Sequence, residues 1–167
     1  MKPLLTDEVQ LRDMTVDDLP IFFEYQLDRE ANRMAAFTAK DPEDREAFMQ
    51  HWNKVMGNEA NIKKTVLFEG QVAGNVLQFE FFGHQTVAYW LGKQYWGKGI
   101  ATRALSEFIH QVGTRPLYAR VAKDNIGSFR VLEKCGFLIC GEDKGYANAR
   151  GEEIEEYILR LEVASIE

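Results

Sequence analysis

A glycine-rich junction is the part of this sequence best suited to bind a ligand. Residues 91–102 read LGKQYWGKGIAT, with Gly97 and Gly99 directly before an expected helix. The first N–H groups of a helix have no partner within it, and the helix dipole adds about half a positive charge there. Glycine lets an anion approach such a backbone closely. The junction therefore predicts a binding site for a phosphate or pyrophosphate over residues 95–102.

The same glycines are compatible with three interpretations. The phosphate-binding loop of nucleotide hydrolases is matched by Gly92-x-x-x-x-Gly97-Lys98, but Gly99 stands where that loop needs the Ser or Thr that holds Mg²⁺. A dinucleotide-binding fingerprint lacks its third small residue, and no strand–helix–strand unit opens the chain. The third interpretation is a tight turn without a ligand, which the two glycines alone would favour.

Metal and disulfide chemistry are not indicated. Two cysteines, Cys135 and Cys140, are too few for a disulfide framework, and we interpret both as packing residues. The three histidines are scattered and form no metal-binding spacing with them. The formal net charge of −6 argues against general nucleic-acid binding, because phosphate contacts need a basic excess. We therefore expect neither a metal nor a nucleic-acid partner.

The composition is typical of one globular domain. The chain has 167 residues, of which 46% are hydrophobic and 28% charged, and this favours a single domain over residues 1–167. No apolar stretch approaches the roughly 18 residues that a membrane span needs. The first ten residues, MKPLLTDEVQ, contain no apolar signal-peptide core. We therefore expect a cytoplasmic protein without a membrane-bound part.

The elements that must position the junction alternate between strand and helix patterns. Apolar residues at helical spacing predict helices after Thr15, from Asp41-Pro42 to Gly57, over 100–112, and from Asp124 or Asn125 to Gly136. Strand patterns cover 9–12, 62–68, 72–81, 86–91, 117–122, 137–140 and 154–161, with a polar segment at 142–153. This order indicates a mixed α/β fold in which helix 100–112 joins two neighbouring strands.

Two motifs follow one another in the second half of the chain. The first is the loop Gln94-x-x-Gly97-x-Gly99, and the second is a helix that opens with Asn125-x-x-Ser128 and ends in Gly136-Phe137. With these motifs the sequence resembles the GCN5-related N-acetyltransferase (GNAT) family. The segment Tyr89-Trp90-Leu91-Gly92 and the Asn-x-x-Ser spacing are most similar to the RimJ/RimL branch, which includes ribosomal-protein N-terminal acetyltransferases. The resemblance spans the chain in element order and is sharpest over residues 87–137.

The resemblance implies a fold, a co-substrate and a set of binding residues. The implied fold is a mixed, mostly antiparallel sheet of about seven strands, splayed between strands four and five and flanked by about four helices. The loop would bind the pyrophosphate of acetyl-CoA, and free backbone groups of the fourth strand would hold its pantetheine arm and polarise its thioester carbonyl. The residues implied in acetyl-CoA binding are Trp90, Leu91, Gly92, Tyr95, Trp96, Gly97, Lys98, Gly99, Ile100, Ala101, Thr102, Asn125 and Ser128.

For catalysis the resemblance implies direct attack of a neutral amine on the thioester. A base removes the amine proton, and an acid protonates the departing CoA thiolate. The usual acid, a tyrosine seven residues after the Asn, is Leu132 here, and the fifth-strand glutamate of a related ribosomal-protein enzyme falls on Arg120. Ser128 is then the candidate acid. The candidate bases are Glu80, His84 and Glu24, although an amine that titrates near neutrality needs none.

The predicted function is transfer of an acetyl group from acetyl-CoA to a primary amine. We expect the first two helices, residues 83–86 and the segment 142–153 to determine the acceptor, because loops on a scaffold usually carry selectivity. A protein N-terminus, an amino acid, a polyamine and an aminoglycoside remain open, and only the branch resemblance favours the first. The alternative class is a non-catalytic acyl-CoA-binding or sensing domain. The sequence is compatible with a monomer and with a homodimer.

Overall fold

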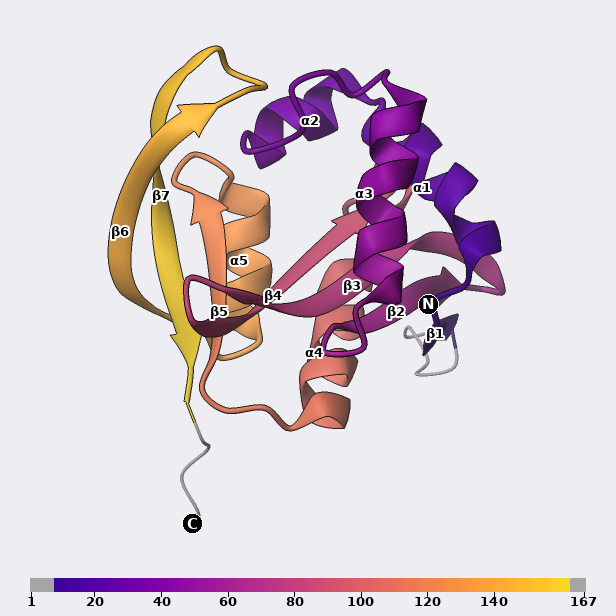
Figure 1. Ribbon diagram of the computed structural model, residues 1–167. Coiled ribbons are helices and arrows are strands. Elements are labelled where there is room, and N and C mark those ends of the chain that lie inside the picture. Colours follow the sequence, from indigo (N-terminus) through magenta and orange to yellow (C-terminus); the bar gives the residue numbers. More distant parts are fainter. Residues whose placement is uncertain (1–7, 163–167) are drawn as a thin grey trace.

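The computed structural model describes residues 8–162 and contains a seven-stranded sheet with helices on both faces (Figure 1). The strands are β1 (Val9–Asp13), β2 (Ile62–Phe68), β3 (Gln71–Phe81), β4 (His84–Leu91), β5 (Leu117–Ala122), β6 (Leu138–Ala147) and β7 (Glu152–Leu161). The α-helices are α1 (Leu19–Gln26), α2 (Arg29–Ala35), α3 (Arg45–Gly57), α4 (Ile100–Val112) and α5 (Ile126–Lys134), and two short 3₁₀ helices are η2 (Val16–Asp18) and η3 (Lys93–Tyr95). The predicted mixed α/β class and its seven strands are confirmed, with five α-helices in the described chain rather than about four.

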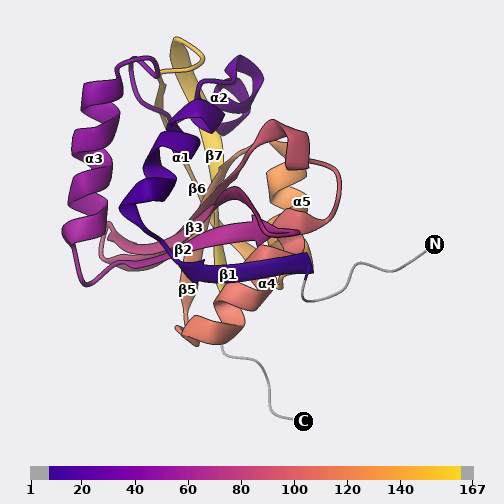
Figure 2. The same ribbon diagram turned by 90° about the vertical axis from the view of Figure 1, so that its right-hand side faces the viewer.

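The helices form two layers, one on each face of the sheet. Helices α1 and α3 lie on one side of strands β2 to β4, and α4 and α5 lie on the other (Figure 2). The alternation of β3 serves both layers, because Val76 packs in the core beneath α4 while Leu77 packs against α1 and α3. Leu105 and Phe108 of α4 are fully buried in the larger core. Both faces of the central strands are therefore covered.

The sheet is nearly divided in the middle. Its order is β1-β2-β3-β4-β5-β7-β6, and β4 and β5 form its parallel pair. A parallel pair needs a crossover, and α4 supplies it. Within residues 8–162 one register pair, Thr86 with Tyr118, joins β4 to β5, whereas β4 stays paired with β3 as far as Leu91. Beyond Thr86 the two strands diverge, which confirms the predicted splay.

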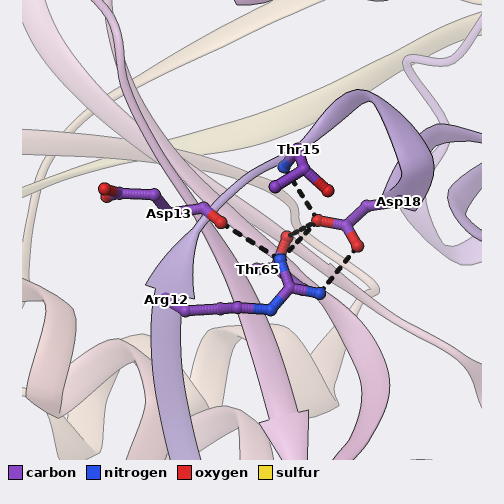
Figure 3. Close-up of polar contacts among 5 residues, drawn as sticks. All are labelled: Arg12, Asp13, Thr15, Asp18 and Thr65. Atoms are coloured by element: carbon purple, nitrogen blue, oxygen red, sulfur yellow. Dashed lines mark hydrogen bonds and ion pairs between the residues drawn. The ribbon is translucent and has the colours of Figure 1, made fainter.

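A buried charge cluster fixes the entry into α1. The carboxylate of Asp18 accepts hydrogen bonds from both terminal nitrogens of Arg12, at 2.7 and 2.8 Å, and from the Thr65 hydroxyl at 2.6 Å (Figure 3). The Thr15 N–H donates a further bond to it at 3.0 Å. Thr15 and Asp18 thus form a capping box, and the same carboxylate connects the helix start to β1 and β2.

Two helices differ from the sequence-based expectation. The sequence pattern did not predict α2, whose N-cap Asp28 accepts a hydrogen bond from the Ala31 N–H. Helix α3 begins at Arg45 rather than at Asp41-Pro42, so the predicted start was wrong. Asp44 is the N-cap, and the earlier Asp41 closes a separate turn by accepting from the Glu43 N–H at 3.1 Å. Capping residues at both 41 and 44 made the sequence ambiguous.

The segment 142–153 is not a linker, which corrects the expectation of a polar loop there. Residues 142–147 continue β6 and pair with β7, and the hairpin turn covers residues 148–151. Strand β6 is an edge strand, and most of its side chains are exposed. Its charged residues pair across strands, as Lys144 does with Glu153 at 3.5 Å. A strand without a buried face shows no apolar alternation, so the pattern could not reveal it.

The two cysteines differ in exposure, and both thiols are free. Burial raises the pKa of Cys135 to about 11, which keeps it a neutral packing residue as predicted. Cys140 is exposed on the edge strand β6, so the prediction that it is a packing residue was wrong. The described residues bring together no group of three His, Cys, Asp or Glu side chains able to hold a metal. Within residues 8–162 no helix combines the length and the apolar run required to cross a membrane.

Candidate active site

A cavity of about 480 Å³ opens where β4 ends and α4 begins. It is lined by α2, the end of β4, the glycine loop, the start of α4 and one face of α5. Eleven of the thirteen residues predicted to bind acetyl-CoA line it: Trp90, Leu91, Tyr95, Trp96, Gly97, Gly99, Ile100, Ala101, Thr102, Asn125 and Ser128. Gly92 and Lys98 are not among the lining residues. The fold therefore brings the two sequence motifs to one cavity.

The glycine loop leaves the first N–H groups of α4 open to a ligand. Gly97 and Gly99 have φ values of 74° and 77°, in the left-handed region that favours glycine. A Cβ built on either residue meets no protein atom within 4 Å, so the space above the loop is empty. Gly99 is the N-cap of α4 and has no side chain that could accept from the helix N–H groups. These groups form a ready anion site.

Positive side chains lie along the same cavity. Arg130 and Lys134 stand four residues apart on α5 and both line it. Residues at that spacing share one helix face, so the two cations extend the anion site away from α4. Neither residue was predicted from the sequence, although both lie within the second motif, four residues apart. A polyanionic ligand fits this wall.

The backbone of β4 offers free hydrogen-bonding groups toward the splay. The Gly92 N–H donates to the Ala73 carbonyl of β3 at 2.9 Å. Successive residues of a strand direct their backbone N–H groups to opposite sides, so Trp90, like Gly92, directs its N–H toward β3. Tyr89 and Leu91 direct theirs toward the diverging β5. The implied backbone donors Trp90 and Gly92 are therefore occupied by the sheet, and Tyr89 joins Leu91 in their place. Gly92 is needed for space instead, since a Cβ there would lie 2.8 Å from the Tyr25 ring.

Trp90 and Trp96 contribute through their side chains. The Trp96 indole N–H donates to the Leu91 carbonyl at 3.2 Å and fixes the loop over the strand end. The Trp90 indole nitrogen is buried and has no hydrogen-bond partner among the described residues. An unsatisfied buried donor costs roughly 1–3 kcal/mol. Because Trp90 lines the cavity, a ligand carbonyl or amide oxygen would complete it.

Ser128 is held by a tyrosine from the splayed strand. Its Oγ lies 2.9 Å from the Tyr89 hydroxyl oxygen. Burial raises the pKa of Tyr89 to about 12, partly opposed by the hydrogen bond with Ser128, so the phenol stays protonated at neutral pH. Asn125 caps α5 by accepting from the Ser128 N–H at 3.3 Å, and this fixes the start of the helix. Leu132, at the position of the usual acid, is buried and cannot donate a proton.

A second cavity of about 390 Å³ meets the first at this tyrosine–serine pair. Strands β3, β4 and β5, the end of α2 and the segment after it, helix α5 with its N-cap, and one residue of β7 line it. The two cavities share five residues: Ala35, Tyr89, Trp90, Asn125 and Ser128. Two reactants entering by the two cavities would therefore meet beside Ser128.

The three candidate bases lie away from both cavities. Glu80 is exposed on β3 opposite Gln85. His84 is exposed at the start of β4 and stacks on the Tyr118 ring, with 4.1 Å between ring centroids. Glu24 is exposed on α1. None of the three lines either cavity. A different carboxylate, Glu156 of β7, lines the second cavity and was not singled out from the sequence.

With this geometry in place, comparison with known proteins defines the class. The model of the acetyltransferase (GNAT) domain matches residues 8–138. This chain belongs to the GNAT acetyltransferase family. It is 26% identical over 172 residues to the uncharacterized N-acetyltransferase p20 of Bacillus licheniformis, and the match covers 96% of each chain.

Solved structures agree on the fold. Spermidine N-acetyltransferase of Vibrio cholerae, in complex with CoA and spermine, superposes with a TM-score of 0.76 at 16% identity, over 93% of this chain and 95% of that one. RimL, a ribosomal L7/L12 α-N-protein acetyltransferase in complex with CoA, gives 0.76 at 16% identity, over 94% and 96%. Microcin C7 self-immunity acetyltransferase MccE, in complex with acetyl-CoA and AMP, gives 0.76 at 18% identity, over 94% and 93%.

The family and the first cavity agree on the co-substrate. The protein is an acetyl-CoA-dependent acyltransferase. The uncapped start of α4, the cations of α5 and the unpartnered Trp90 donor fit a long ligand that carries phosphates at one end and amides in its arm. The phosphate-binding loop of nucleotide hydrolases is excluded, because the mostly antiparallel GNAT sheet replaces the parallel sheet that such a loop requires.

Proposed function

We propose that this protein transfers the acetyl group of acetyl-CoA to a primary amine by direct attack in a ternary complex. The observation that carries the proposal is the meeting of two cavities where β4 and β5 diverge. Reactants held on separate sides of such a junction can be oriented for a one-step transfer, and no acyl group needs to reside on the protein. The first cavity would hold acetyl-CoA, and the second would admit the amine.

The predicted acetyl-CoA residues divide by role in this proposal. The diphosphate would lie on the N–H groups at the start of α4, with Gly97 and Gly99 leaving it room. The positive charge of Lys98 would attract the diphosphate without lining the cavity. Arg130 and Lys134 would face the phosphate on the ribose of CoA. The pantetheine arm would follow the free backbone of β4 from Leu91 to Tyr89.

The chemistry is assigned to the junction. The amine nitrogen attacks the thioester carbon, a C–N bond forms, and the C–S bond breaks with its electron pair on sulfur. The N–H groups of Tyr89 and Leu91 are the available donors for the thioester oxygen. Ser128 would give a proton to the sulfur and regain one from the nitrogen, with the protonated Tyr89 hydroxyl holding the serine in place. Glu80, His84 and Glu24 have no part in this assignment.

Within the family we assign the protein to the RimJ/RimL-like branch. The Tyr89-Trp90-Leu91-Gly92 segment and the Asn125-x-x-Ser128 spacing support this assignment. RimL is named for acetylation of a protein α-amine, and a protein N-terminal amine is accordingly one acceptor in our proposal. The spermidine enzyme has the same fold, so the branch alone does not decide the acceptor.

The acetyl-CoA site is tested by a pair of variants at one position. Asn and Asp are nearly the same size, and both tolerate a positive φ, so Gly99→Asn and Gly99→Asp should fold with similar stability. Only Gly99→Asp brings a negative charge against the diphosphate. We expect CoA to raise the Tm of the wild type and of Gly99→Asn, and its Kd to increase at least tenfold in Gly99→Asp. An unchanged Kd in Gly99→Asp would place the diphosphate elsewhere.

Turnover separates an enzyme from a sensing domain. Thiol release from acetyl-CoA is measured with a panel of primary amines, and we expect amine-dependent release. A CoA-dependent rise in Tm without release would favour the non-catalytic alternative. In the same assay Tyr89→Phe, which keeps the ring and removes the hydroxyl, should lower kcat about tenfold while the KM for acetyl-CoA stays within threefold. An unchanged kcat would remove Tyr89 from the assignment.

A further inference from the structure

The second cavity has aromatic walls. Phe79 and Phe81 of β3 form one side, Trp90 of β4 lies at the junction with the first cavity, and Phe37 follows α2. Phe37 and Phe81 are each 39% exposed to solvent, although folded proteins usually bury such rings. Ala88 is exposed in the middle of β4 and leaves the floor of the cavity open. These surfaces favour an apolar body over a polar one.

The charges in this cavity are few and opposed. Within the described chain, Arg120 and Glu156 are the charged side chains that line it. Arg120 contacts Glu156 at 3.0 Å and Asp143 at 3.1 Å, and its guanidinium lies over the Phe81 ring at 5.1 Å. Arg120 is therefore already partnered on two sides and is not free to bind a substrate carboxylate.

Glu156 has capacity left for a cation. Its side chain is 12% exposed, and it shares Arg120 with the more exposed Asp143. Asp143 does not line the cavity, but it places a second carboxylate on the same guanidinium, so Arg120 neutralises Glu156 only in part. Burial raises the pKa of Glu156, and the hydrogen bond from Arg120 opposes this rise only in part. A carboxylate with a raised pKa in a cavity is a stronger proton acceptor than an exposed one.

From these walls and charges we propose that the acceptor is a primary amine on an aromatic or bulky aliphatic body. Its ammonium group is the only cation that it carries, and this group binds to the Glu156 carboxylate. This inference rests on the proposed function and narrows its acceptor. A polyamine or an aminoglycoside brings several cations, for which the cavity offers one carboxylate, and Arg120 already shares it. The shared chemistry has two sources, a small arylalkylamine or a peptide N-terminus whose first side chain is apolar.

Proton balance fits this placement. The incoming ammonium gives one proton to the Glu156 carboxylate and becomes the neutral amine that attacks the thioester carbon. As the C–N bond forms and the C–S bond breaks, the nitrogen sheds a second proton, and the CoA sulfur gains one through Ser128. Glu156 then returns its proton to solvent. The net products are the amide, free CoA and one proton.

Matched acceptor pairs test the acceptor class. At saturating acetyl-CoA, kcat/KM is measured for phenethylamine against ethylamine, and for a peptide beginning with Phe against one beginning with Gly. Spermidine and kanamycin complete the panel. We expect the apolar member of at least one pair to exceed its partner at least tenfold, which is about 1.4 kcal/mol, and to exceed spermidine and kanamycin. The pair that responds identifies the source.

Two variants test the residues. Glu156→Gln should raise the KM for the amine at least tenfold while the KM for acetyl-CoA stays unchanged, which a merely structural role would not produce. Glu155→Gln is the matched control, because this neighbouring carboxylate is exposed and pairs with Lys123 outside the cavity. Phe81→Ala should reduce the preference for the apolar acceptor at least threefold, and it tests the cavity even where Glu156→Gln folds poorly.

The outcomes distinguish this inference from the function on which it rests. Preference for spermidine or kanamycin would overturn the acceptor class and leave acetyl transfer intact. An unchanged amine KM in Glu156→Gln, together with an unchanged preference in Phe81→Ala, would remove the second cavity as the acceptor site. If no amine of any kind releases thiol, the proposed function fails, and this inference fails with it.

Discussion

Asp18 is nearly fully buried, at 3% exposure, and its charge is stabilised by neighbouring donors. The two-point contact from Arg12 and the bond from Thr65 replace the hydration that burial removes. Burial alone would raise the pKa of the carboxyl. These hydrogen bonds outweigh it, and the pKa of Asp18 falls to about 2. The cluster therefore stabilises the fold only while Asp18 is ionised.

This produces a pH dependence of defined sign. The folded pKa of about 2 lies below the roughly 3.9 of an unfolded aspartate, so the unfolded state binds more protons between these values. The contribution is fully present above about pH 4 and is lost as the pH falls toward 2. We expect Asp18→Asn to lower the free energy of unfolding by about 2 kcal/mol at pH 7. The free energy of unfolding of this variant should also fall less steeply between pH 4 and pH 2.5 than that of the wild type, as measured by urea unfolding from pH 7 to 2.5.

The control for this variant is Asp13→Asn at the end of β1. Asp13 pairs with Lys64 but is exposed to water, and exposed ion pairs contribute little. In this variant the free energy of unfolding should fall with decreasing pH as steeply as in the wild type. An Asp18→Asn protein with the same pH dependence as the wild type would contradict the assignment of acid sensitivity to Asp18.

At the residue scale, the sequence revealed what is local. Gly97, Gly99 and Asn125 could be predicted because a positive φ and a helix cap depend on near neighbours. Tyr89 and Glu156 could not, because their importance depends on which strand face meets α5 and which strand lies beside β5. One signal was available for Glu156, since it interrupts an alternating strand pattern between Ile154 and Ile158.

Strand β4 connects the two halves of the site because its backbone groups point alternately toward β5 and toward β3. Val87, Tyr89 and Leu91 direct backbone groups toward β5, and the residues between them bond to β3. Past Thr86, β5 has moved away, so Tyr89 and Leu91 have no strand partner on that side in the described chain. Adjacent residues of one strand should therefore respond differently to a ligand.

Amide hydrogen exchange measures this difference. Without CoA, the N–H groups of Tyr89 and Leu91 should exchange faster than those of Ala88 and Trp90, which bond to β3. Acetyl-CoA should slow Tyr89 and Leu91 at least tenfold by supplying acceptors, beyond any slowing at Ala88 and Trp90. Equal slowing at all four amides would mean that the ligand stabilises the strand as a whole and does not bind its free edge.

Helix α2 and the outer half of β6 were not predicted from the sequence, and the reason is the same for both. The α2 sequence, REANRMA, is too short to form a long apolar stripe, and it is recognisable only by its Asp28 cap. The outer half of β6 is solvated on most of its length and is held by pairing with β7. Periodicity reports a face that is buried, so a long helix such as α4 is found and a solvated edge strand is not.

At the scale of the whole molecule, the order of the strands could not be derived from local patterns. Nothing in periodicity indicates that β7 inserts between β5 and β6. The resemblance carried by the two motifs predicted the number of strands and the splay between the fourth and the fifth, but not this strand order. The split between β4 and β5 also raises a physical question, because one register pair joins the two parts of the sheet in residues 8–162.

The core answers this question. Strand residues from one side of the split, such as Val76 and Val87, and from the other, such as Leu117 and Leu159, belong to a single buried cluster. Phe108 of α4 is fully buried within it. Since the hydrophobic core crosses the split that the backbone does not, we infer that the domain unfolds as one cooperative unit.

Two probes on separate parts of the fold test this cooperativity. Far-UV circular dichroism follows all elements, and tryptophan fluorescence follows Trp52 in the α1–α3 cluster together with Trp90 and Trp96 at the cavity. The two thermal transitions should coincide, and CoA at 100 times its Kd should shift both by the same amount, equivalent to about 2.7 kcal/mol. If CoA moved only the fluorescence transition, the ligand would be stabilising a local unit, and the split in the sheet would be a true boundary between two folding units.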